Sequence, residues 1–165
     1  ASGGSMMINS PIYVIYSRIL DLINECPFIP EQIKQTGGVM LCETNERKTG
    51  MSVLLSVNSS SIKTLVCGEI ECIVDIIFYY RGLFVGNEPK LDAINLVSSI
   101  GYWLEGAEIS YEGEETSILD YYPIQFNSGE IVRMQITEHA HISRRFEDDF
   151  FQVEQTVQAI TRFAS

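Results

Sequence analysis

The stretch EIECIVDIIFYYR at residues 69–81 decides the fold, because it alternates over a length that suits one long β-strand. One face of this strand is apolar throughout, and its members are Ile70, Cys72, Val74, Ile76, Phe78 and Tyr80. The other face mixes charged and apolar side chains, namely Glu69, Glu71, Ile73, Asp75, Ile77, Tyr79 and Arg81. A half-apolar second face predicts that another element or another subunit covers it.

The residues after this strand predict a helix from Lys90 to Glu105. The segment Asn87-Glu88-Pro89 is a start signal, and Gly106 suits the position just after the last turn. Apolar residues recur along the helix and predict a buried stripe of Leu91, Ile94, Val97, Ile100 and Leu104. We expect Trp103 to lie beside this stripe.

Another helix is predicted nearer the start of the chain. Ser10 supplies a hydroxyl N-cap and Pro11 a first-turn proline, whereas Cys26-Pro27 ends the helix. The predicted buried stripe of this helix is Ile12, Ile15, Ile19 and Leu22. We expect the apolar residues just after it to fix the following turn to the core.

Four further strands are predicted from alternation, at Val39–Glu43, Met51–Val57, Val132–Ser143 and Phe151–Phe163. Polar segments between them predict loops at Thr44–Gly50, Asn58–Ser61, Glu112–Thr116 and Arg144–Asp149. Together these elements predict an α+β fold. We expect a mixed, mainly antiparallel sheet with two helices packed on one face and long hairpin extensions.

The composition narrows the functional classes. The 165-residue chain has a formal net charge of −11, which argues against a nucleic-acid-binding surface, since such a surface needs clustered Lys and Arg. No apolar run is long enough to cross a bilayer, so we expect no membrane partner. We expect residues 1–5 to be the remnant of an expression tag and residues 6–165 to form one domain. The cysteines Cys26, Cys42, Cys67 and Cys72 form no Cys-x-x-Cys pair, and we expect them to be reduced.

No motif in the sequence predicts catalysis. There is no nucleophile elbow and no P-loop, and the paired carboxylates in loops are expected to be solvated. The strand pair Glu69 and Glu71 is expected to meet basic groups on a neighbour or to face a lumen. We therefore expect no enzymatic activity, no catalytic residues and no cofactor. His139 and His141 are weak candidates for metal ligands, because alternate residues of a strand face the same way. Their strand face is polar throughout, so the histidines equally suit a solvated or subunit-facing strand.

The order of elements resembles the tail-terminator and minor capsid (head–tail joining) proteins of long-tailed bacteriophages and phage-like particles. The resemblance rests on VDIIFYYR at the end of the long strand and on LDAINLVSSIGYWLEG, where Trp103-Leu104 finishes the helix. It also rests on the closing strand, which ends in AITRF. It covers the chain from about Ser10 to Phe163.

The resemblance implies a structural virion protein. Such a protein caps the head-proximal end of the tail tube as a homo-hexameric ring, ends tube polymerisation and presents a joining surface to the head-completion (connector) protein. Its partners would be further copies of itself, the tail tube protein and that head-side protein, first in the host cytoplasm and then in the virion tail. Genome DNA would pass through the lumen without specific binding, and an acidic chain suits this because like charges do not adhere.

A closed ring needs one patch that binds a different patch on the next copy. One candidate patch is the half-apolar strand face with Ile73, Ile77 and Tyr79. The other is the polar strand that begins at Arg133, followed by Arg144 and Arg145 in the next turn. The alternative function, from a different class, is a small ligand- or metal-binding β-rich protein built on the histidine strand.

Overall fold

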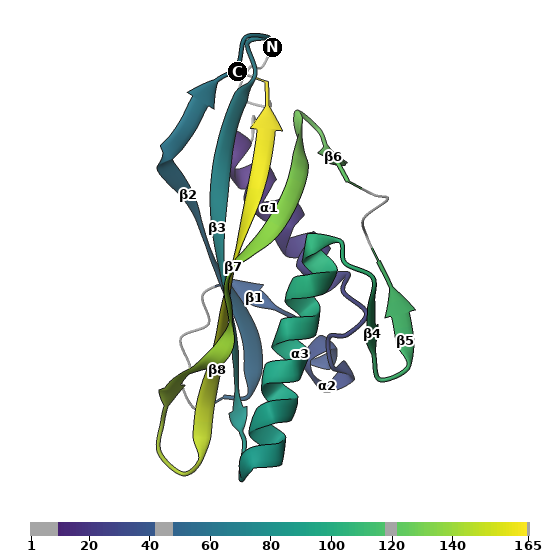
Figure 1. The fold of residues 1–165 in the computed structure, drawn as a ribbon. Helices are drawn as coiled ribbons and strands as arrows, with labels where there is room; N and C mark the ends of the chain where they lie inside the picture. Colours follow the sequence, from purple (N-terminus) through teal and green to yellow (C-terminus); the bar gives the residue numbers. More distant parts are fainter. Residues whose placement is uncertain (1–9, 42–47, 118–121, 165) are drawn as a thin grey trace, which may run out of the picture.

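A six-stranded sheet with helices on one face forms the body of the protein (Figure 1). The computed structural model describes residues 10–41, 48–117 and 122–164. The sheet order is β1-β2-β3-β8-β7-β6, and every neighbouring pair is antiparallel except β1 with β2, which is parallel. The predicted α+β class with a mixed, mainly antiparallel sheet is therefore confirmed.

The described elements have the following bounds. The helices are α1 (Pro11–Asn24), α2 (Glu31–Gln35) and α3 (Asn87–Glu105). The strands of the sheet are β1 (Met40–Leu41), β2 (Gly50–Thr64), β3 (Ile70–Leu83), β6 (Ile124–Phe126), β7 (Gly129–Arg145) and β8 (Phe150–Phe163). A separate hairpin pairs β4 (Ile109–Tyr111) with β5 (Glu114–Thr116). No helix in the described ranges is long and apolar enough to span a membrane.

One apolar cluster joins both long helices to a single face of the sheet. The β3 residues in this cluster are Val74, Ile76 and Phe78, all from the face predicted to be apolar. Residues from α1 such as Ile19 and from α3 such as Ile100 belong to the same cluster. Both helices therefore pack on the same sheet face, as predicted.

The start of α1 confirms its predicted capping but corrects its stripe. The Ser10 hydroxyl accepts a hydrogen bond from the Tyr13 amide at 3.2 Å, and Pro11 is the first helical residue. Ile12, which the sequence places in the buried stripe, is 46% exposed. The physical reason is that residues 11–13 of the first turn are all exposed, so core packing begins only at Ile15.

The helix α3 ends as predicted, and its predicted stripe is confirmed at Val97, Ile100 and Leu104 but not at Leu91. Gly106 adopts a left-handed conformation with φ 90° and caps the last turn. Leu91 is 64% exposed, and the buried face consists of Ala93, Leu96, Val97, Ile100, Trp103 and Leu104. Three residues of a helix turn by about 300°, so a strict three-residue repeat drifts around the helix by about 60° at each step. Over the nine residues from Leu91 to Ile100 the drift amounts to about half a turn, and Leu91 lies on the opposite side from Ile100. Trp103 therefore belongs to the core face, not beside it.

Two predicted loops are parts of strands. The segment Asn58–Ser61 lies within β2, at a register shift between Asn58 and Lys63. There the Ser61 hydroxyl accepts a hydrogen bond from the Ile73 amide at 2.8 Å, so a side chain replaces a missing ladder bond. The acidic segment at 112–116 forms a hairpin, because Glu112 and Gly113 both adopt positive φ and make a tight two-residue turn.

The end of β7 also differs from the prediction. Arg144 and Arg145 pair with β8, so the turn is restricted to residues 146–149, where Asp148 and Asp149 have positive φ. The closing segment is a strand, as predicted. Within the described residues the short first strand covers Met40–Leu41, and the end of its predicted range lies outside them. The predicted loop at Thr44–Gly50 also lies largely outside the described residues.

The contact between α3 and β8 is unusually close at Gly101. The side-chain amide of Gln155 lies against this glycine and donates a hydrogen bond to the Val97 carbonyl at 3.0 Å. A Cβ atom at position 101 would overlap the Gln155 amide. Glycine is costly inside a helix, but here it permits the buried amide to reach the helix backbone.

We predict that Gly101→Ala lowers the free energy of unfolding by about 1–3 kcal/mol, because the new methyl group overpacks this contact. Urea unfolding followed by the fluorescence of Trp103 measures the loss. The matched control is Asn95→Ala on the exposed side of the same helix, which should not destabilise. In a Gln155→Ala background the same glycine replacement should cost little. An equal cost in both backgrounds would show that the overlap with Gln155 is not the cause.

Candidate subunit interface on the open sheet face

The sheet face opposite the helices carries a row of apolar side chains. We call this surface the open face and define its apolar members as Leu54, Ile73, Ile77, Tyr79 and Ile160. Strand pairing places them together, because Leu54 pairs with Ile77 and Ile73 pairs with Ile160. In Figure 1 the helices lie to one side of β3 and β8. The sequence predicts three of the five members and misses Leu54 and Ile160. These two residues lie on other strands, and only the strand register places them beside the β3 residues.

The two candidate patches of the sequence form one continuous surface. Ile73 pairs with Ile160 on β8, and Ile160 in turn pairs with Arg133 on β7. A second row runs from Leu54 through Ile77 and Thr156 to Glu138. The half-apolar strand and the polar strand are therefore not alternatives, since they are the centre and one flank of the same face.

The helices do not bury the apolar centre of the open face. None of its five apolar members belongs to the core cluster formed with the described helices. Leu54 is 40% exposed, and the other four are half-buried by their in-plane neighbours. Apolar groups left in this state favour association, because removing them from water is favourable.

Ion pairs and hydrogen bonds surround the apolar centre. At one end Glu71 accepts from Arg162 Nε at 2.8 Å and meets Lys63 Nζ at 3.1 Å. The hydrogen bond from Arg162 is the main cause that lowers the pKa of the Glu71 carboxyl, and Lys63 adds to it. This carboxyl is only 15% exposed, so the pair is held more firmly than an ordinary surface ion pair.

Another polar pair lies among the apolar side chains. Gln158 donates to Asp75 at 2.8 Å, and strand pairing places these two residues between Ile73 and Ile77. At the far end Arg81 donates to Gln152 at 2.8 Å, and Gln152 donates to Ser143 at 2.9 Å. Apolar side chains together with hydrogen-bonded polar groups are usual in a protein–protein interface.

Arg144 and Arg145 lie on opposite sides of the sheet. Arg144 pairs with Gln152 on the open face, and its guanidinium lies 4.6 Å from the centre of the Phe146 ring. Arg145 pairs with Phe151 and lies 5.8 Å from the centre of that ring, toward the helical side. The sequence treats the two arginines as one charged turn, but only Arg144 belongs to the open face.

His139 and His141 do not lie together, although their spacing on a strand predicts that they do. A register shift between Glu138 and His141 inserts one residue and rotates the two histidines apart. His139 packs against Tyr102 of α3, with ring centres 6.2 Å apart. His141 lies on the open face, 3.2 Å from a carboxylate oxygen of Glu138.

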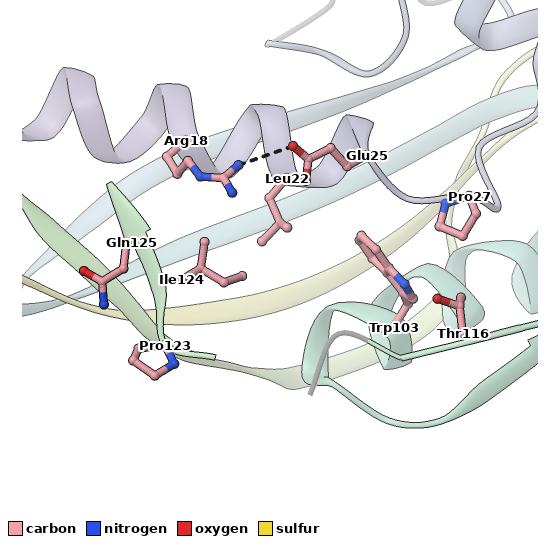
Figure 2. Close-up of a pocket in the computed structure, with 9 residues that line it drawn as sticks. All are labelled: Arg18, Leu22, Glu25, Pro27, Trp103, Thr116, Pro123, Ile124 and Gln125. Carbon is pink, nitrogen blue, oxygen red and sulfur yellow. Dashed lines mark ion pairs between the residues drawn. The ribbon is translucent and has the colours of Figure 1, made fainter. Parts of the chain in front are cut away.

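A cavity of about 590 Å³ lies between α1, the end of α3, β5 and β6 (Figure 2). Arg18 and Glu25 form an ion pair of 3.6 Å at its α1 wall. Trp103 lines it, is 4% exposed, and its indole N–H has no hydrogen-bond partner among the described residues. The described lining residues supply no nucleophile beside a base, so they do not assemble a hydrolytic site.

Comparison with known proteins relates this chain to others through its fold. No known protein family and no curated protein matches the sequence. Five chains of solved structures match the fold, and one of them comes from the virion of a native gene transfer agent particle. The match has a TM-score of 0.54 at 12% sequence identity and covers 93% of this chain and 95% of that one. At this identity the match shows a shared fold over nearly the whole of both chains.

We predict that Glu71→Gln destabilises the protein at neutral pH and that the difference from wild type disappears in acid. Folding lowers the pKa of the Glu71 carboxyl below its ordinary value of 4.5, so the ionised carboxyl stabilises the folded protein at pH values above 4.5. That contribution is lost as the pH falls through the folded pKa, because both proteins then carry a neutral group. Thermal unfolding between pH 7 and pH 3 measures the effect, with Glu115→Gln at an exposed site as the control. A constant difference across this range would exclude the ion pair as its source.

Proposed function

We propose that this chain is a structural protein of a phage-like virion. The observation that carries the proposal is the shared fold, over 93% of this chain, with a component of a gene transfer agent virion. Similarity over nearly the whole of both chains supports a common type of building block. The proposed role is structural and not enzymatic.

Within the virion we propose that the chain closes the head-proximal end of the tail tube as a homo-hexameric ring. It would end tube polymerisation, bind the tail tube protein on one side and present the joining surface to the head-completion protein on the other. The open face supports this proposal, because it joins an apolar centre to a polar rim over four strands. A ring requires such a patch to bind a different surface on the next copy.

The charge of the chain supports the same arrangement. A formal net charge of −11 in 165 residues gives the assembled ring a strongly negative surface. A negative lumen lets genome DNA pass, since the protein offers few cations to neutralise its phosphates. The chain would then reside in the virion at the head-proximal end of the tail.

We predict that Leu54→Asp prevents ring formation while leaving the monomer folded. The replacement puts a charge at the centre of the open face, and burying an unpaired charge in an interface is costly. Light scattering measures the oligomer mass, and an assembly reaction with tail tube protein measures tail length. The matched control is Leu91→Asp, which changes a leucine on α3 that is 64% exposed, compared with 40% for Leu54. Normal rings and tails from Leu54→Asp would exclude the open face as the interface.

We predict that Arg144→Glu weakens the ring more than Arg145→Glu does. The two replacements reverse the same charge one residue apart, but only Arg144 lies on the open face. The ionic strength at which rings dissociate measures the difference, because charge complementarity is screened by salt. If both variants dissociate at the same ionic strength, the interface does not involve Arg144 more than Arg145. If the wild-type protein forms no ring and leaves tail length unchanged, the tail-terminator proposal itself is wrong.

A further inference from the structure

Three metal-binding side chains converge across two strands of the open face. Glu138 and His141 lie on β7 and Glu154 lies on β8, and His141 pairs directly with Glu154. One ligand atom from each of these residues lies within 4.8 Å of the other two. Within this group His141 Nε2 and Glu138 Oε1 are 3.2 Å apart. This spacing matches the roughly 3.3 Å between two ligands of a tetrahedral zinc ion with bonds of about 2.0–2.1 Å.

The orientation of His141 suits a metal ligand. Its Nδ1 lies 2.8 Å from the backbone carbonyl of His139, and a carbonyl oxygen can only accept, so Nδ1 carries the hydrogen. The lone pair of the neutral ring is then on Nε2, which faces the two carboxylates. A ligating histidine commonly has its second ring nitrogen held by a backbone carbonyl in this way.

We propose that Glu138, His141 and Glu154 form a binding site for a divalent metal ion of the zinc class. Imidazole nitrogen and carboxylate oxygen are both zinc ligands, and three protein ligands leave the fourth position to water. The carboxylate and imidazole donors favour zinc over magnesium, which prefers an octahedral shell of oxygen atoms. The position of His139 against Tyr102 excludes the two-histidine site that the strand spacing predicts.

The site lies where the sheet is least regular. The pairing of β7 with β8 shifts register between Ile136 and Glu138 and again between Glu138 and His141. Each shift leaves a residue of β7 without a partner in the ladder. A metal ion bound to both strands would join them across this gap, and it would stabilise the folded chain because the unfolded chain does not assemble the three ligands.

The test is calorimetric titration of the isolated chain with zinc chloride, so its outcome does not depend on ring formation. The background is Cys42→Ser/Cys67→Ser, because these thiols compete for zinc and Cys67 is exposed. We expect one zinc ion per chain, a rise in melting temperature with zinc, and no binding of magnesium chloride. His141→Ala and Glu154→Gln should each weaken zinc binding at least about tenfold.

The matched control is His139→Ala, which removes the other histidine of the chain and leaves all three ligands in place. It should retain zinc binding. If His141→Ala does not fold, Glu154→Gln still tests the site, because glutamine has nearly the same shape as glutamate but lacks its charge. Absence of zinc binding by the background protein would overturn the proposal. An equal loss with His139→Ala, or unchanged binding with Glu154→Gln, would overturn it as well.

Discussion

The hydrogen bond from the Gln155 amide to the Val97 carbonyl fixes how α3 sits on the sheet. It is buried, it lies against a glycine that leaves room for it, and it joins the middle of the helix to the middle of β8. A buried amide that lost this partner would be costly, so α3 has little freedom to slide or rotate. This contact adds to the apolar packing that holds α3 on the sheet.

The end of α3 also contacts β7. The carboxylate of Glu105 accepts a hydrogen bond from the Ile136 amide at 2.8 Å. This contact lies next to the register shift between Ile136 and Glu138. After the second shift, between Glu138 and His141, His139 contacts Tyr102 of α3 and His141 lies on the open face.

The sequence predicts the elements whose signals are local. The cap of α1, the glycine that ends α3 and the apolar face of β3 are each specified within a few residues. The predicted stripe of α3 is confirmed at Val97, Ile100 and Leu104 but is wrong at Leu91, because a repeat of three residues drifts away from the helical turn. The candidate interface was divided into two because Leu54, Ile77 and Thr156 become neighbours only through a register that no single strand encodes.

The slips along β7 also bear on how such a chain diverges. After each inserted residue, the positions of β7 that faced the core face the open side, and the reverse. The strand therefore consists of short stretches, and the alternation of inward and outward side chains changes from one stretch to the next. If a bulge migrates by one or two positions, the residues between its old and new places exchange faces and must exchange polarity as well. The backbone path survives such steps while the aligned residues do not. A strand of this kind can therefore keep its backbone path while its sequence changes.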